Sequence, residues 1–192
     1  VVPATVAVLD GRIVVGLDRA ELERLATEKD VAKVSRRDYA WALAGCRTGA
    51  TTVSATMIAA RAAGIGVFAT GGIGGVHRDA TETGDVSADL PAIARYPVTT
   101  VTAGAKAFLD LPRTVEYLET LGVPLLGYQT DEFPAFYSRA SGVPLPHRVE
   151  SPTEAAAVVR AARDLDYQGG LVLAVPVPEE AAIPSDQLDE VI

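Results

Sequence analysis

Short apolar runs alternate with longer amphipathic stretches through most of the chain. The predicted strands are 66–70, 98–102, 124–128 and 170–174. The predicted helices between them are 53–63, 90–95, 112–121 and 151–165. A strand that is apolar at successive positions is typically covered on both faces, and a helix after each strand is typical of parallel connections. The pattern therefore predicts an α/β/α fold, in which helices cover both faces of a mostly parallel sheet.

Turn and capping signals predict smaller elements and their ends. Residues 4–9 and 12–16 are predicted to form a hairpin around an Asp-Gly turn. Asp18 and Ser35 are residue types that cap helix N-termini, and each precedes a stretch with helical spacing. Ser151 begins the sequence Ser-Pro-Thr-Glu, which has the pattern of a capping box with proline at the first helical position.

The composition is that of a folded domain with an acidic surface. Of the 192 residues, 48% are hydrophobic and 22% charged, which predicts one domain over 1–192. The formal net charge of −8 argues against a nucleic-acid partner, because phosphate backbones are bound by clustered basic side chains. A small phosphorylated ligand stays compatible with this charge, since it needs only a local pocket of donors.

Cysteine use and hydropathy predict the compartment. Cys46 is the single cysteine, so no intrachain disulfide can form, and a reducing cytoplasm is expected. The sequence has neither a charged-then-apolar leader nor an apolar run long enough to span a bilayer. We therefore expect no signal peptide and no membrane contact.

Lysine is rare in this chain, which draws attention to Lys106. Of the 17 basic residues only Lys29, Lys33 and Lys106 are lysines, and the rest are arginines. Lys106 follows the strand predicted at 98–102 and is expected in the first turn of a helix, among apolar neighbours. Both surroundings lower the pKa of an ammonium group. A neutral amine there could form a Schiff base with a sugar carbonyl, whereas the alternative is a surface lysine without a chemical role.

Two further segments suggest phosphate or ligand binding, each with an ordinary structural alternative. The glycine-rich loop 70–75 would let backbone amides approach a ligand closely, but it could equally be a flexible turn. Thr52 and Val53 lie at the start of a predicted helix and could seat a phosphate, although threonine is also a common N-cap.

A polar loop over 77–89 holds candidate metal ligands. Its side chains include His77, Asp85 and Asp89, and oxygen ligands of this kind suit Mg²⁺ or Mn²⁺. The spacing matches no established metal motif, so the pattern alone favours an ordinary acidic loop over a metal site.

Several segments, in order along the chain, resemble one known family. They are VSRRD at 34–38, GATTV at 49–53, FATGGIGGVHR at 68–78, SADL at 87–90, AGAK at 103–106 and TDEFPAFYSR at 130–139. Together they resemble the pseudouridine-5′-phosphate glycosidase (pseudouridylate synthase) family, which also includes proteins from indigoidine pigment clusters. The similarity covers nearly the whole chain, and the long glycine-rich and Asp-Glu-Phe-Pro segments are its most specific parts.

The resemblance implies a lyase of nucleoside catabolism that cleaves the C–C glycosidic bond of pseudouridine 5′-phosphate to uracil and ribose 5-phosphate. Lys106 occupies the position of the family's Schiff-base lysine, and Asp85 that of its ligand to one Mn²⁺ ion per subunit. The matching substrate-binding positions are Lys33, Thr52, Val53, Ser87, Ala88 and Asp89. His77 lies in a motif near the site with an open role. The resemblance also implies a homotrimer.

The sequence departs from the family in two ways. The family has an N-terminal segment with a glutamate acid/base, and a C-terminal part with a site asparagine. This sequence starts after the first and ends before the second, and Ala174-Val175-Pro176 stands where the family usually has Ala-Asn-Pro. We therefore expect either a chain truncated at both ends or a divergent member, with little turnover by these residues alone.

Three functions are therefore compatible with the sequence. The first is the C–C glycosidase. The second is a catalytically silent domain that binds a phosphosugar or nucleotide. The third is a relative from indigoidine biosynthesis that acts on a different substrate.

Overall fold

The chain divides after Ile65 into two units, residues 1–65 (unit 1) and 66–192 (unit 2), and each is described by itself. The computed structural model describes residues 1–184, so residues 185–192 of the predicted domain lie outside the described part. That both units form one domain stays a prediction.

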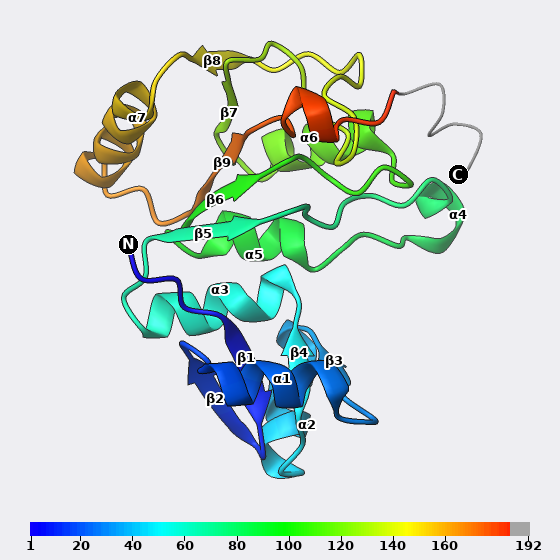
Figure 1. The fold of residues 1–192 in the computed structure, drawn as a ribbon. Helices are drawn as coiled ribbons and strands as arrows, with labels where there is room; N and C mark the ends of the chain where they lie inside the picture. The colour runs from blue at the N-terminus through cyan, green and yellow to red at the C-terminus, as the bar shows by residue number, and fades with distance from the viewer. Residues whose placement is uncertain (185–192) are drawn as a thin grey trace. The chain divides into compact units, whose positions relative to one another are not determined.

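Unit 1 is built on a four-stranded sheet with the order β2-β1-β4-β3 (Figure 1). Its strands are β1 (Val6–Leu9), β2 (Arg12–Val15), β3 (Ala32–Val34) and β4 (Gly49–Thr51). β1 is antiparallel to β2 and β4, whereas β3 and β4 are parallel. The predicted hairpin is confirmed. β4 was not predicted as a strand, because its three small residues form no apolar run.

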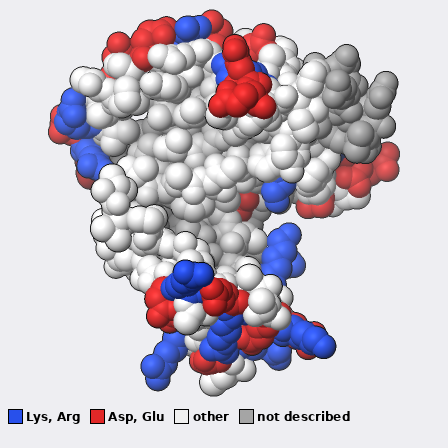
Figure 2. Space-filling model, viewed as in Figure 1, with Lys and Arg blue, Asp and Glu red and all other residues white. Residues whose placement is uncertain are grey.

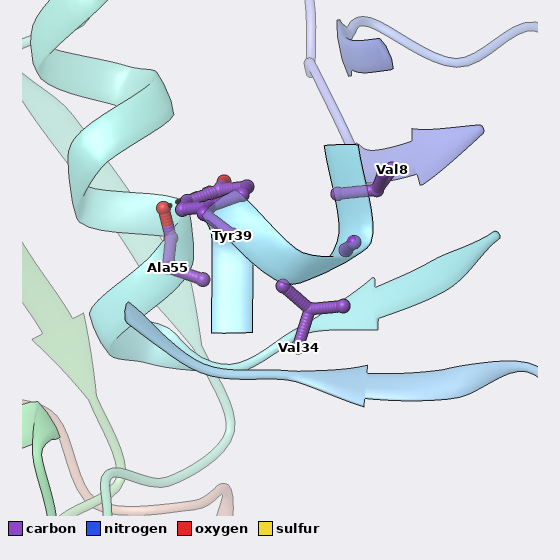
Figure 3. Close-up of a cluster of buried hydrophobic side chains, with 5 residues drawn as sticks. Val8, Val34, Tyr39 and Ala55 are labelled. Carbon is purple, nitrogen blue, oxygen red and sulfur yellow. Dashed lines mark hydrogen bonds between the residues drawn. The ribbon is translucent and has the colours of Figure 1, made fainter. Parts of the chain in front are cut away.

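Three α-helices and a 3₁₀ turn complete unit 1. They are α1 (Arg19–Thr27), η1 (Arg36–Asp38), α2 (Tyr39–Ala44) and α3 (Val53–Ala62). Val8, Val34, Tyr39, Ala42 and Ala55 form its buried cluster (Figure 3). The Tyr39 hydroxyl donates a hydrogen bond to the Ala55 carbonyl at 2.9 Å, and burial raises the pKa of this phenol to about 12.

Helix α1 buries none of its residues, and polar contacts hold its ends. The predicted cap is confirmed, because the Asp18 carboxylate accepts from the Glu21 amide at 2.8 Å and the Glu21 carboxylate accepts from the Asp18 amide at 2.9 Å. Arg24 donates to both carboxylate oxygens of Asp10, at 2.7 and 2.6 Å. These bonds lower the pKa of the Asp10 carboxyl.

Unit 2 is a five-stranded sheet with the order β5-β6-β9-β7-β8, and all its neighbouring strands are parallel. The strands are β5 (Val67–Thr70), β6 (Thr99–Thr102), β7 (Leu125–Tyr128), β8 (His147–Val149) and β9 (Leu171–Ala174). Four of them were predicted. β8 was not, because it is short and two of its three residues are polar.

The helices of unit 2 flank this sheet (Figure 1). They are α4 (Ala80–Thr83), α5 (Asp89–Arg95), α6 (Leu111–Thr120) and α7 (Pro152–Asp164), with a 3₁₀ turn η2 (Glu179–Ala181). Leu126, Leu171 and Val149 pack with Ala155 of α7 in one buried cluster. The predicted mixed α/β fold with a parallel sheet between helices is confirmed.

Two details of unit 2 differ from the sequence prediction. Ser151 caps α7 as predicted, accepting from the Glu154 amide at 3.2 Å, but the Glu154 carboxylate accepts from the amide of Glu150 at 2.8 Å and not from that of Ser151. β5 lies at an edge of the described sheet, so Val67 is 59% exposed although its run is apolar.

Charged side chains are distributed differently over the two units. On the face seen in Figure 2, unit 2 presents a broad uncharged area that carries one group of acidic side chains and has other charges toward its edges, whereas unit 1 carries both signs intermixed. This face shows no continuous basic surface of the kind that a nucleic-acid backbone requires. Among the described residues, no helix has the length and apolar character needed to cross a membrane.

Candidate functional site

Two loops at the carboxyl ends of neighbouring strands form the centre of the candidate site. The glycine-rich loop follows β5, and the loop that contains Lys106 follows β6. The amide of Ala103 donates to Gly71 O at 3.1 Å, that of Ile73 to Gly104 O at 3.0 Å, and that of Lys106 to Ile73 O at 3.2 Å. The two loops therefore form one hydrogen-bonded layer at the edge of the sheet where parallel α/β folds bind ligands.

The main chain of Lys106 is fixed in this layer, while its side chain is exposed. The predicted helix start at this lysine is wrong. Helix α6 begins only at Leu111, with the Asp110 carboxylate accepting from the Arg113 amide at 3.0 Å. The segment stays non-helical because its amides bond to the glycine-rich loop. Lys106 therefore does not lie in the first turn of a helix, and the argument from the dipole of its own helix does not apply.

Ser87 and Asp89 hold the glycine-rich loop from its other side. The buried Asp89 carboxylate accepts from the Gly74 amide at 2.9 Å, and the Ser87 amide donates to Gly75 O at 3.0 Å. A Cβ at Gly74 would lie 2.1 Å from Ser87 Oγ, so only glycine fits this contact. The structure therefore brings Ser87, Ala88 and Asp89 against the same loop that bonds to Lys106.

His77 and Asp85 face each other across the polar loop. The His77 amide donates to Asp85 O at 3.0 Å, and His77 Nε2 lies 3.7 Å from Asp85 Oδ2. The imidazole also lies 6.0 Å, between ring centroids, from Phe108, two residues after Lys106. Within residues 1–184, no group of three or more His, Cys, Asp or Glu side chains is placed to hold a metal ion. The Asp85 carboxylate is a ligand type that suits Mn²⁺, and the imidazole of His77 lies beside it.

Phe136, from the loop after β7, covers the glycine-rich loop. Its amide donates to Ala103 O at 2.9 Å, and its backbone adopts a left-handed conformation with φ of 63°. A Cβ at Gly72 would lie 2.4 Å from its ring. The sequence pattern predicted this loop but gave Phe136 no role, because the contact joins segments far apart in the chain.

The remaining predicted substrate residues lie in unit 1. β3 and β4 are parallel, and Lys33 is exposed on β3, in register with Ala50. Thr52 follows β4 and precedes α3, and its hydroxyl lies 2.9 Å from Ser54 Oγ. Val53 is buried as the first residue of α3. Thr52 therefore lies at the N-terminus of α3, the position named in the phosphate hypothesis, and Lys33 lies on β3, which pairs with the strand before α3.

These features define a class of α/β protein with a lysine and a glycine-rich loop at the carboxyl edge of a parallel sheet. The chain belongs to the family described as indigoidine synthase A like protein, whose model matches residues 1–192.

The curated proteins that this chain resembles are longer than the chain itself. It is 54% identical over 191 residues to a pseudouridine-5′-phosphate glycosidase from Caldanaerobacter subterraneus subsp. tengcongensis, covering 100% of this chain and 62% of that protein. It is 56% identical over 191 residues to one from Methylobacterium nodulans, covering 100% of this chain and 57% of that protein. The chain thus spans less than two thirds of the length of these curated relatives.

Two solved structures share the fold. The prealnumycin C-glycosynthase AlnA, in complex with ribulose 5-phosphate, superposes with a TM-score of 0.94 at 42% identity, over 99% of this chain and 63% of that one. An indigoidine synthase A (IdgA)-like protein from Thermotoga maritima has a TM-score of 0.91 at 38% identity, over 97% of this chain and 62% of that one.

Proposed function

We propose that the protein to which this chain belongs cleaves the C–C glycosidic bond of pseudouridine 5′-phosphate, giving uracil and ribose 5-phosphate, with Lys106 as the nucleophile. The observation that carries the proposal is the bonding of the Lys106 loop to the glycine-rich loop, which Ser87 and Asp89 also contact. Relatives named for this activity, at more than half identity over the chain, support it.

The chemistry explains why an amine is needed. A C-glycoside has no linking heteroatom that an acid could protonate to release the base. The Lys106 amine would displace the ring oxygen at the anomeric carbon, and that oxygen would take up a proton. The nitrogen lone pair then forms an iminium on the sugar as the bond to uracil C5 breaks, and uracil takes up a proton at C5. Water would hydrolyse the iminium, releasing ribose 5-phosphate and restoring the amine.

The other residues bind and orient the substrate in this proposal. Ser87, Ala88 and Asp89 would contact it from the glycine-rich layer, and Lys33, Thr52 and Val53 are proposed as further substrate-binding residues. Asp85, with His77 beside it, would hold a Mn²⁺ ion. When bound, such an ion polarises and orients oxygen atoms of the substrate. A homotrimer in the cytoplasm is part of the same proposal.

A second candidate is a relative that forms or breaks a C–C bond to a different sugar phosphate. The structural similarity to a C-glycosynthase complexed with ribulose 5-phosphate favours it. Both candidates use a phosphorylated sugar. They differ in the group bonded to the sugar carbon and in the position of the sugar carbonyl.

Uracil release from pseudouridine 5′-phosphate tests the proposal. The longest expressible form should release uracil with Mn²⁺ present, and Lys106→Arg should lower the rate by at least about a thousandfold, because arginine keeps the charge but is no nucleophile. Asp85→Asn should raise the Mn²⁺ concentration needed, whereas Asp79→Asn, a change in the same loop, should not. Binding of the substrate without any uracil release would support a silent domain, and turnover only of other C-glycosides would support the second candidate.

A further inference from the structure

Thr114 of helix α6 makes a contact with the glycine-rich loop that no motif in the sequence indicated. Its side chain is fully buried, and its hydroxyl accepts a hydrogen bond from the Val76 amide at 3.0 Å. The same hydroxyl donates to the Asp110 carbonyl at 2.7 Å. Asp110 in turn donates its amide to Val76 O at 2.9 Å. Both polar groups of the Val76 backbone are therefore held by the start of α6.

This contact lies at the far end of the layer that carries Lys106. The glycine-rich segment bonds to the Lys106 amide through Ile73 O, and three residues later to Thr114 and Asp110 through Val76. The segment between them is glycine, with little conformational preference of its own. A Cβ at Gly75 would lie 2.4 Å from Thr114 Oγ1, so the chain rests directly on this side chain.

We infer that Thr114 is a positioning residue for the Lys106 nucleophile, an inference that rests on the proposed function. It touches no reacting atom. It fixes the glycine-rich segment against α6, and the segment fixes the main chain of Lys106. Without the hydroxyl, the buried Val76 amide loses its acceptor, and the segment must move to find another. A shift of this kind would change where the amine meets the anomeric carbon, with little effect on Thr52 and Val53 of unit 1, the candidate phosphate seat.

Thr114→Val tests the inference, because valine keeps the shape of threonine and removes only the hydroxyl. Thr100→Val is the matched control, since Thr100 is also fully buried, and its hydroxyl has no hydrogen-bond partner within the described residues. Borohydride trapping of the Lys106 adduct with ribose 5-phosphate, followed by mass spectrometry, gives the rate and its dependence on sugar concentration. Hydrogen exchange at the Val76 amide reports directly on its hydrogen bond to the Thr114 hydroxyl.

The expected results differ clearly between the variants. Thr114→Val should slow adduct formation about ten- to a hundredfold at saturating sugar, with the half-saturating concentration nearly unchanged. Its Val76 amide should exchange at least about tenfold faster. Thr100→Val should match the wild type in both. If Thr114→Val does not fold, the pair Thr114→Ser and Thr114→Ala isolates the hydroxyl, and the serine variant should retain the faster rate.

The outcomes separate this inference from the proposed function. Wild-type protein in which Lys106 is never labelled contradicts the proposed function. Labelled wild type, together with a folded Thr114→Val that is labelled equally fast, overturns the inference alone. An equal loss in Thr100→Val would also overturn it, because the effect would then follow from any buried threonine.

Discussion

Lys106 combines a fixed main chain with an exposed side chain. Its amide donates to Ile73 O, and its carbonyl accepts from the Leu109 amide at 3.0 Å. These two bonds fix the backbone of Lys106 within its loop. The other two lysines, Lys29 and Lys33, are exposed residues of unit 1. A nucleophile benefits from such a fixed attachment, because orientation supplies a large part of catalysis.

Tyr39 provides a test of the core of unit 1 at the same scale. Its phenol has a pKa raised from 10.0 to about 12 by burial, so folding favours the neutral form. Its contribution to stability is therefore fully present below pH 10 and is lost as the pH rises through about 12. Tyr39→Phe should lower the free energy of unfolding by about 1 kcal/mol at neutral pH, because the bond to Ala55 O is lost. The stability of this variant should then fall less steeply than that of the wild type in this alkaline window.

Urea unfolding across that range measures this prediction. Tyr167→Phe is the comparison: it removes another phenol whose pKa is raised by burial, so it should also flatten the alkaline slope, but it leaves the bond from Tyr39 to Ala55 O in place. Identical alkaline slopes in the wild type and in Tyr39→Phe would contradict the assignment.

At the scale of elements, Gly104 fixes how β6 passes into the Lys106 loop. Its φ is +94°, and a Cβ there would lie 1.8 Å from the Pro134 carbonyl oxygen. Gly84 also has a positive φ, of +69°, but a Cβ there would meet no atom within 4 Å. Gly84→Ala should therefore cost about 1 kcal/mol of unfolding free energy, from backbone conformation alone. Gly104→Ala should cost about 3 kcal/mol or more, because the loops must separate.

Chemical denaturation of both variants separates the two causes. Equal losses of unfolding free energy at the two glycines would mean that the contact with Pro134 can relax at little cost. The layer of loops would then be loosely packed at this point.

The helix starts show what local sequence can and cannot predict. Asp18 and Ser151 were found from sequence, because a cap depends on residues three positions apart. The false helix start at Lys106 came from the helix-favouring run Ala-Lys-Ala-Phe-Leu. The Lys106 amide instead bonds to Ile73 O, and the amide of Asp110, which follows the run, bonds to Val76 O; both acceptors are distant in sequence. The helix predicted over 112–121 is confirmed, and α6 begins one residue earlier, at Leu111, after its Asp110 cap.

At the scale of the whole molecule, the order of apolar runs predicted the parallel sheet but not all of its strands. β4 and β8 contain three residues each, with glycine or polar side chains, and their neighbours in the sheet hold them in place. The candidate site was found where strands end, because parallel strands bring their carboxyl ends to one edge. Thr114 could not be found this way, since a threonine within a helix has no distinctive pattern.

The proposed residues belong to two units, each described by itself. Lys106, Asp85 and the Ser87–Asp89 segment belong to unit 2, whereas Lys33, Thr52 and Val53 belong to unit 1. The relatives of known name are longer than this chain, which spans 62% of the first of them. The complete activity is therefore proposed for the whole protein. The reaction of Lys106 with a sugar is the part of it that this chain can test most easily.

Borohydride trapping with ribose 5-phosphate shows whether Lys106 is the nucleophile. The sugar should add to Lys106 alone, and the mass of the reduced adduct should appear on the peptide that contains it. Because the sequence has only two other lysines, the site can be assigned without ambiguity. Lys106→Arg should abolish the label and Lys29→Arg should retain it. Label on Lys29 or Lys33 instead, or none in a folded protein that binds the sugar, would contradict the account.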